Sequence, residues 1–263
     1  ATGVVHNRVW RVRNLTFAWR VARLFAKLLV GLWISATSFA RADSPQRHAI
    51  IRSWSRDLLH LAGIEVRAVN FPDDAERPVT LVANHVSWAD IFALNTQRAC
   101  HFIAKAELRR WPLAGRLLAN VGTVFINRSE RKETHRLKEV VHRLLDAGET
   151  VAVFPEGTTS AGRDVLKFHA SLLEPIVASE GEVWVVAIRY FRRPAAHGVV
   201  AEQRTDAAAY IGAMSLIESL RAIHDAEPVI AEVRFIEAIN CAGMSRREVA
   251  QRAQALIGEA VRA

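Results

Sequence analysis

The sequence predicts an α/β fold in which a mostly parallel central sheet is flanked by helices. Short apolar runs alternate along the chain with longer segments whose apolar residues recur at helical spacing. Polar residues and glycines follow directly on several of these runs. The 263 residues, 51% hydrophobic and 24% charged, suffice for one α/β domain and an appendage. Because parallel strands need a crossover between them, such alternation indicates a parallel sheet.

Residues 1–40 predict a membrane-anchoring segment. No acidic residue precedes Asp43, and aromatic side chains, Trp19 and Trp33 among them, lie between basic ones. The uncharged stretch 28–40 has 13 residues, whereas a spanning helix needs roughly 20. We therefore expect a basic amphipathic helix that lies in the membrane interface. A signal peptide, a true span and an ordinary core helix remain alternatives.

A second helix is expected over residues 47–62, after a break at Ser44 and Pro45 and before Gly63. The segment 71–78, with its prolines and aspartates, reads as a link. These patterns predict a two-helix membrane-binding region at residues 1–70 and an α/β domain at residues 71–263.

The domain elements follow in alternation. Strands are predicted at 79–83, 101–104, 123–126, 151–154, 184–188 and 229–236. Helices are predicted at 88–94, 108–120 with a break near Pro112, from a cap at Ser129 to Gly148, at 172–178, and from a capping box at Ser245 and Glu248 to about Arg262.

Net charge and cysteine content limit the kinds of partner and the cellular compartment that can be expected. The formal net charge is +8 and the sequence pI about 10.3, which favours an anionic partner such as nucleic acid, an anionic membrane or a phosphorylated substrate. Cys100 and Cys241 are isolated. They predict neither a disulfide framework nor a metal site, and a reducing cytoplasm is the simplest compartment.

Residues 84–90 read Asn-His-Val-Ser-Trp-Ala-Asp and directly follow a predicted strand. A carboxylate from Asp90 near the imidazole of His85 would orient the ring and stabilise its protonated form, so that His85 can act as a general base toward an alcohol. A histidine satisfied structurally at a strand end is the alternative. The chain has no Gly-x-Ser-x-Gly sequence, which counts against a serine hydrolase.

Residues 154–160 read Phe-Pro-Glu-Gly-Thr-Thr-Ser after another predicted strand. Glu156, Gly157, Thr158 and Thr159 are candidate substrate-binding residues, since they offer a carboxylate, hydroxyls and a backbone that a ligand can approach closely. A plain turn is the alternative.

Two basic residues are candidates for phosphate contact. Lys105 and Arg128 each follow a predicted strand, and an arginine there can hold a phosphate with two hydrogen bonds. Surface salt bridges are the alternative. The apolar residues Trp111, Leu113, Leu117 and Leu118 would suit either core packing or the wall of an acyl-chain tunnel.

Together with the segments 102–108 and 122–128, the two motifs resemble the glycerolipid acyltransferase superfamily, most closely the 1-acyl-glycerol-3-phosphate acyltransferases. The resemblance covers roughly residues 45–200. It implies that His85 is the base and Asp90 its partner, and that Arg128, Glu156 and Gly157 lie at the glycerol phosphate acceptor. Many members have arginine where this chain has Thr159, and often proline near Val185.

The resemblance implies transfer of a fatty acyl group from acyl-CoA or acyl-carrier protein to a lysophospholipid hydroxyl, giving phosphatidic acid in phospholipid biosynthesis. Lyso-ornithine lipid is the alternative acceptor. No metal or bound cofactor is required. The expected partners are a membrane lipid surface, the lysolipid and the thioester donor, and the expected location is the cytoplasmic face of the inner membrane. Nucleic acid is not expected. A non-catalytic basic protein of the membrane surface is the alternative of another class.

Overall fold

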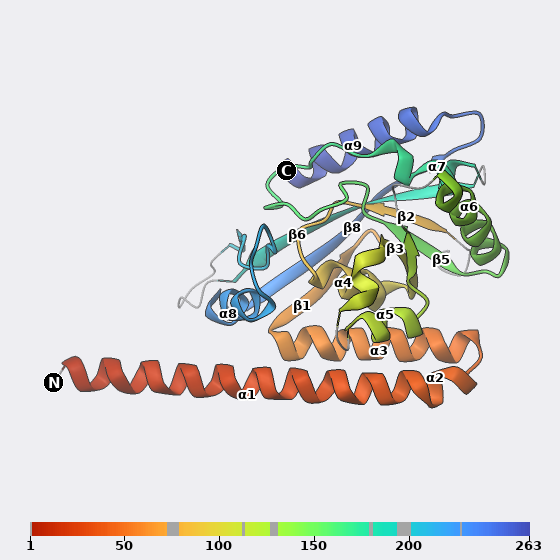
Figure 1. Ribbon diagram of the computed structural model, residues 1–263. Helices are drawn as coiled ribbons and strands as arrows, with labels where there is room; N and C mark the ends of the chain where they lie inside the picture. Colours follow the sequence, from red (N-terminus) through yellow and green to blue (C-terminus); the bar gives the residue numbers. More distant parts are fainter. Residues whose placement is uncertain are drawn as a thin grey trace.

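A computed structural model describes residues 2–72, 79–111, 114–126, 131–178, 181–193, 201–226 and 228–263. Within these ranges eight strands form one sheet, in the order β1-β8-β6-β2-β5-β3-β4, with β7 beside β6 (Figure 1). The strands are β1 Ile64–Val69, β2 Thr80–Ala83, β3 Cys100–Lys105, β4 Val124–Ile126, β5 Thr150–Val153, β6 Glu182–Arg192, β7 Gln203–Arg204 and β8 Val229–Asn240.

The predicted mostly parallel sheet is confirmed. Strand β2 pairs in parallel with β5 and β6, β3 pairs in parallel with β5 and β4, and β1 with β8. Only β7 and β8 run antiparallel to β6. The carboxyl ends of β2, β5, β3 and β4 therefore meet at one edge of the sheet, the usual place for a site in an open α/β sheet.

Helices cover both faces of the sheet. One face packs against α3 Ser44–Ala62, α4 Ala89–Gln97 and α8 Leu216–Ala226, and the other against α6 Arg131–Asp146, α7 Glu174–Val177 and α9 Arg246–Arg262 (Figure 1). All four residues of β2 and of β5 are buried, because side chains on both faces of a central parallel strand meet a helix layer.

The N-terminal helix α1 Thr2–Ala36 lies along α3, outside the sheet layers, and is followed by α2 Ser38–Arg41 (Figure 1). Leu24 packs against Leu58 of α3. At Gly31 the two helices approach so closely that a Cβ atom would lie 2.8 Å from Nε1 of Trp54. Among the helices of the described ranges, none combines the length and the apolar character needed to cross a bilayer.

Several expected boundaries were wrong. Asp43 caps α3 with a capping box and Pro45 lies in the first helical turn, where a missing N–H group costs nothing; the predicted break at Ser44 and Pro45 is therefore the helix start. Gly63 ends α3 as predicted, with φ +88°. The segments 108–120 and 172–178 each begin with a 3₁₀ turn, Ala106–Arg110 and Ala170–Leu172, before the short helices α5 Ala114–Asn120 and α7.

Three elements were missed. Strand β1 alternates apolar Ile64 and Val66 with charged Glu65 and Arg67, a period-2 signal inside the region 1–70 that is predicted to be helical. It pairs along β8, so the sheet begins before the boundary expected at residue 71. Strand β7 has only two residues. Helix α8 has Leu216, Leu220 and Ile223 at helical spacing, a local signal that the prediction did not use. Ser129, the expected helix cap, falls outside the described residues.

Candidate active site

The two motifs lie side by side because their strands are neighbours. Val82 of β2 is in register with Val153 of β5, so the loops that leave both strands start at the same edge. The first loop begins with Asn84, whose amide group donates to the carbonyl of Ile188 at 2.9 Å and accepts from the N–H of Ile188 at 2.7 Å. This buried side chain continues the pairing of β2 with β6 beyond the last strand residue and fixes where His85 begins.

His85 and Asp90 form the predicted pair. Nδ1 of His85 lies 2.8 Å from Oδ2 of Asp90, which also accepts from the backbone N–H groups of Val86 at 2.6 Å and Ser87 at 2.8 Å. Asp90 is fully buried in the first turn of α4, where the helix dipole favours a negative charge. A carboxylate there assigns the proton of the neutral ring to Nδ1, which leaves the Nε2 lone pair to accept a substrate proton.

Tyr190 is a site residue that sequence reasoning missed. Its hydroxyl donates to Oδ1 of Asp90 at 2.6 Å, and its side chain is buried. Burial, followed by the charge of Asp90 and this hydrogen bond, raises the pKa of Tyr190 well above its usual value. The phenol therefore remains a donor, and both oxygens of Asp90 are held. The available signal was a polar aromatic residue in the apolar run that follows residue 184.

The carboxylate of Glu156 bonds to backbone N–H groups inside the structure. Oε1 accepts from the backbone N–H of His85 at 2.7 Å and Oε2 from that of Leu166 at 2.9 Å. Only 2% of the residue is exposed. Burial raises the pKa of Glu156, although the two N–H donors oppose the shift. In this structure both carboxylate oxygens join the two motif loops, and the substrate contact expected of Glu156 stays a prediction.

The second loop also holds His85 from other sides. The N–H of Ser160 donates to the carbonyl of His85 at 2.8 Å. The ring of Phe154 stacks on the imidazole, with 4.1 Å between ring centroids and 9° between planes. Backbone and ring are thus both fixed, while 19% of the His85 side chain stays exposed. Preorganisation of this kind is what a general base needs.

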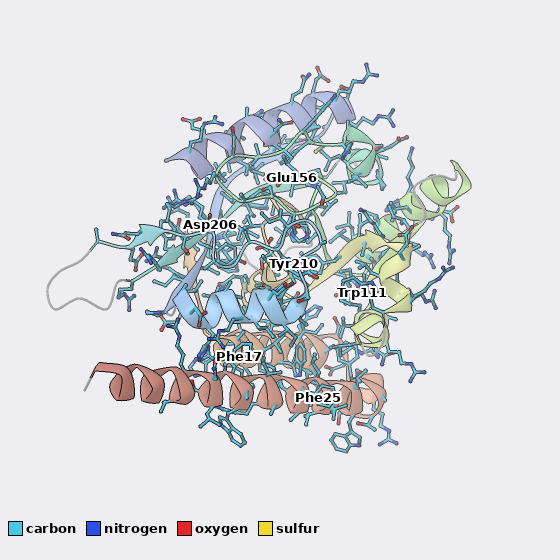
Figure 2. The ribbon with its side chains drawn as sticks, turned by 60° about the vertical axis from the view of Figure 1, so that its left-hand side comes forward. Phe17, Phe25, Trp111, Glu156, Asp206 and Tyr210 are labelled. Carbon is cyan, nitrogen blue, oxygen red and sulfur yellow. The ribbon has the colours of Figure 1, made fainter. Side chains whose placement is uncertain are left out.

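The next three residues of the turn, 157–159, differ in backbone conformation, exposure and hydrogen bonding. Gly157 has φ +69°, a conformation that favours glycine, and Thr158 is exposed. The hydroxyl of Thr159 donates to the carbonyl of Tyr210, and the N–H of Tyr210 donates to the carbonyl of Val86 at 2.9 Å. The loop around Tyr210, which is labelled in Figure 2, therefore joins both motifs. In this structure Thr159 uses its hydroxyl for that link.

The two basic candidates are placed unequally. Lys105 is the exposed last residue of β3 and is in register with Ile126, the last residue of β4. It therefore lies at the same sheet edge as the two motifs. Arg128 falls outside the described residues, so its role stays a prediction. Of the expected apolar set, Leu117 is buried and Trp111 is 51% exposed, while Leu113 is likewise outside the described residues.

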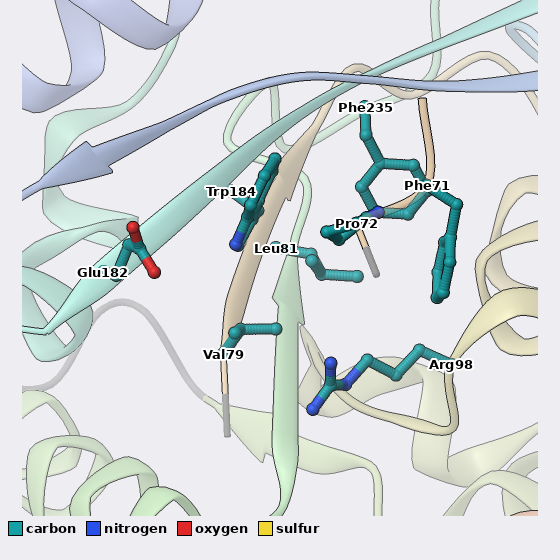
Figure 3. A pocket seen from close by; sticks show the side chains of 8 residues that line it. All are labelled: Phe71, Pro72, Val79, Leu81, Arg98, Glu182, Trp184 and Phe235. Atoms are coloured by element: carbon teal, nitrogen blue, oxygen red, sulfur yellow. The ribbon is translucent and has the colours of Figure 1, made fainter. Parts of the chain in front are cut away.

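A cavity of about 130 Å³ lies at the opposite ends of the strands (Figure 3). Val79 and Leu81 of the β2 segment, Trp184 of β6 and Phe235 of β8 line it. Phe235 makes edge contacts with Phe71 and Trp184, at centroid distances of 5.1 and 6.4 Å. The cavity is on the α4 face of the sheet but at the amino ends of β2 and β6, away from His85.

Comparison with known proteins identifies the family. A family model described as Acyltransferase matches residues 63–190. A lyso-ornithine lipid O-acyltransferase from Pseudomonas aeruginosa is 35% identical over 244 residues, which are 89% of each chain. The chain belongs to the acyltransferase family. The resemblance read from the two motifs is thereby confirmed.

Two further comparisons give a second sequence relative and a crystal structure with the same fold. A 1-acyl-sn-glycerol-3-phosphate acyltransferase from Neisseria gonorrhoeae is 42% identical over 113 residues, 43% of this chain and 44% of that one. The crystal structure of the 1-acyl-sn-glycerophosphate acyltransferase PlsC from Thermotoga maritima matches with a TM-score of 0.59 and 22% identity, over 92% of this chain and 96% of that chain. The fold is therefore that of PlsC. The matched region 63–190 runs from the start of β1 to Tyr190 and so includes both motifs.

Proposed function

We propose that this acyltransferase moves a fatty acyl group from a thioester, acyl-CoA or acyl-carrier protein, to the free hydroxyl of a lysolipid at a membrane surface. The observation that carries the proposal is the partly exposed imidazole of His85, whose Nδ1 is held by a fully buried carboxylate. Such a pair, with no nucleophilic serine in an elbow sequence, suits direct attack by a bound alcohol.

The reaction follows from this geometry. Nε2 of His85 takes the proton of the acceptor hydroxyl as its oxygen attacks the carbonyl carbon of the thioester. Asp90 stabilises the imidazolium that forms, and Tyr190 and the N–H groups of Val86 and Ser87 hold both oxygens of Asp90 in place. The new C–O bond forms, the C–S bond breaks, and the imidazolium returns its proton to the leaving thiolate. We assign stabilisation of the oxyanion to the exposed turn at Thr158.

The outer side of α1 supports a membrane location. Seven apolar residues there are 45–70% exposed: Val12, Leu15, Trp19, Phe25, Leu29, Val30 and Trp33. At 100° per residue they lie on one stripe, opposite Leu24 and Gly31, which face α3. Phe17 lies between α1 and the domain, near His224 (Figure 2). We propose that the stripe enters the lipid interface, at the cytoplasmic face of the inner membrane.

For the acceptor we favour lyso-ornithine lipid. The relative that acts on it aligns along 89% of both chains, whereas the 1-acyl-sn-glycerol-3-phosphate acyltransferase aligns along less than half. Thr159 brings no cation to the turn, and its hydroxyl is bonded to Tyr210. An acceptor without a phosphate needs no cation there. The second candidate acceptor is 1-acyl-glycerol-3-phosphate, favoured by Lys105 at the sheet edge and by the higher identity over the shared segment.

A two-by-two assay tests the proposal. The purified full chain is given lyso-ornithine lipid or 1-acyl-glycerol-3-phosphate, with acyl-CoA or acyl-carrier protein, and the doubly acylated product is measured by mass spectrometry. We expect product with lyso-ornithine lipid and thiol release that His85→Ala removes. Faster acylation of 1-acyl-glycerol-3-phosphate would select the second candidate. No thioester consumption with any pair, by a folded protein, would overturn the enzymatic function.

A further inference from the structure

Five arginines lie on one face of the sheet, next to residues 84–90, the loop that carries His85 and is called the catalytic loop below. This arginine face consists of Arg67 of β1, Arg189 of β6, Arg193 just after β6, Arg204 of β7 and Arg234 of β8. Arg67 and Arg189 both lie opposite Glu232 in the β1–β8–β6 register, so their side chains share a face. Here β6 and β8 extend beyond the end of α9 (Figure 1).

The arginines outnumber the carboxylates they contact. Glu232 accepts from Arg189 at 2.5 Å, from Arg67 at 2.9 Å and from Arg234 at 3.2 Å. The carboxylate of Glu202 contacts Arg67 at 2.8 Å. It also meets the guanidinium of Arg193 at 3.4 Å. Four guanidiniums thus share two carboxylates, and the fifth adds a further positive charge.

That fifth guanidinium, Arg204, donates to the carbonyl of Gly162 at 2.6 Å. Arg67, Arg189 and Arg204 surround the ring of Phe191 at 5.3–5.7 Å from its centroid. Burial, followed by the like charge of Arg189, lowers the pKa of Arg204. Five guanidiniums and two carboxylates leave a formal excess of positive charge on this face.

The arginine face adjoins the active site through two short connections. Gly162, which accepts from Arg204, packs so tightly on Val86 that a Cβ atom would lie 2.8 Å from Cγ2 of Val86, and Val86 follows His85. Arg189 and Tyr190 are consecutive in β6 and point to opposite faces, and Tyr190 holds Asp90. A partner bound on the arginine face would be next to the catalytic loop.

Internal stabilisation accounts for only part of the cluster. Arg189 and Glu232 are buried, but the side chains of Arg234, Arg67 and Arg193 are 33%, 40% and 54% exposed. Exposed ion pairs contribute little to stability, and an uncompensated set of like charges opposes folding. The exposed guanidiniums come from three different segments and spread over an open sheet face. Spread charge suits the surface of an acidic protein, whereas a phosphate group needs donors that converge.

We propose that the arginine face docks the acidic surface of the acyl-carrier protein that delivers the thioester. This inference rests on the proposed acyl transfer from a thioester, and it selects the carrier protein over acyl-CoA as the donor that the surface recognises. Electrostatic docking of this kind raises the association rate and weakens with salt.

The test compares two donors that carry the same acyl chain. The double variant Arg67→Gln/Arg234→Gln of the full chain is assayed with acyl-carrier protein and with acyl-CoA. The matched control is Arg252→Gln, which removes the partner of Glu237, another carboxylate of β8, outside the arginine face. We expect kcat/KM for acyl-carrier protein to fall about tenfold in the double variant, through KM, and the wild-type value to fall steeply with salt. The acyl-CoA value changes less than about twofold, as do both values in the control.

Direct binding separates this inference from the proposed reaction. Fluorescence anisotropy with labelled carrier protein needs no turnover, and thermal unfolding reports whether the double variant is folded. An unchanged acyl-carrier protein KM and unchanged binding in a folded double variant would overturn the inference. An equal rise in both donor KM values would also overturn it, because it would assign the face to the acyl-phosphopantetheine group that both donors share. If the wild-type protein consumes neither donor, the proposed reaction fails. The docking surface would still be supported if the wild-type protein binds the carrier protein and the double variant does not.

Discussion

The catalytic loop and the outer side of α1 depart from the usual distribution of polar and apolar groups in opposite directions. At this loop and the neighbouring loop 154–160, the polar residues Asn84, Asp90 and Glu156 are 0–2% exposed. On α1, the apolar residues Trp19 and Trp33 are 67% and 66% exposed. Polar residues are mostly found outside a globular protein and large apolar ones inside, so each region needs a physical reason.

The two departures are compensated differently. A buried polar group costs free energy unless it is hydrogen-bonded, and each of these three side chains makes at least two hydrogen bonds within the chain. Exposed apolar surface costs about 25 cal/mol per Å² unless something covers it. Among the described residues none covers the α1 stripe. The comparison distinguishes a site that the fold completes from an exposed apolar surface, which is the basis of the proposed membrane contact.

Removal of the base should give the largest effect. His85→Ala takes away the only group proposed to accept the hydroxyl proton, and we expect the rate to fall by about 10²–10⁴. The measurement is thiol release in the presence of lysolipid, with thermal unfolding as the check on folding. Near-normal turnover in a folded His85→Ala protein would show that the loop is structural.

Tyr190→Phe should have the next largest effect. It leaves Oδ1 of buried Asp90 without the hydroxyl that donates to it, and loss of a hydrogen bond to a charged group costs about 1.5–3 kcal/mol. We expect a lower unfolding free energy and a lower kcat with little change in acceptor KM. Tyr210→Phe is the matched control, because Tyr210 joins the loops through its backbone. Equal losses in both variants would contradict a specific role for Tyr190.

Glu156→Gln should destabilise the protein by about 1–3 kcal/mol, because an amide nitrogen would face a backbone N–H group. The folded-state pKa of Glu156 is raised above its ordinary 4.5. Its contribution to stability is therefore fully present below about pH 4.5 and is lost as pH rises through the raised pKa. The excess stability of wild type over the variant should fall along that range, as measured by urea unfolding between about pH 4 and pH 8. An excess that grows with pH would contradict the assignment.

Replacement of two tryptophans on α1 should give the smallest effect on the purified enzyme and a clear one on membrane binding. We expect Trp19→Ser/Trp33→Ser to weaken vesicle binding by about fivefold to tenfold and to leave folding unchanged, since both rings are exposed. Trp111→Ser, at a tryptophan that is 51% exposed but lies outside α1, is the control. A flotation assay with anionic vesicles measures both. Unchanged flotation of the double variant would place the membrane contact elsewhere.

Much of the fold was predictable because its signals are local. The apolar runs of β2 and β5, the helical stripe of α6, Gly63 at φ +88° and the capping box at Ser245 and Glu248 all involve neighbours in sequence. The His85–Asp90 pair belongs to the same class, since five residues separate its members. Strand β1 was missed although its alternation was present, because an edge strand is identified by the partner it finds, here β8.

The sequence by itself determined which residues could do the chemistry, since a strand, a turn and a His-x-x-x-x-Asp spacing are properties of short segments. Only the tertiary structure decided how those residues are held. Glu156 reaches the N–H of His85 across 71 residues of chain and Tyr190 reaches Asp90 across 100. The arginine face likewise forms only where β1, β6, β7 and β8 meet. The physical reason is that hydrogen bonds and burial depend on distances in space, which neither period nor composition reports.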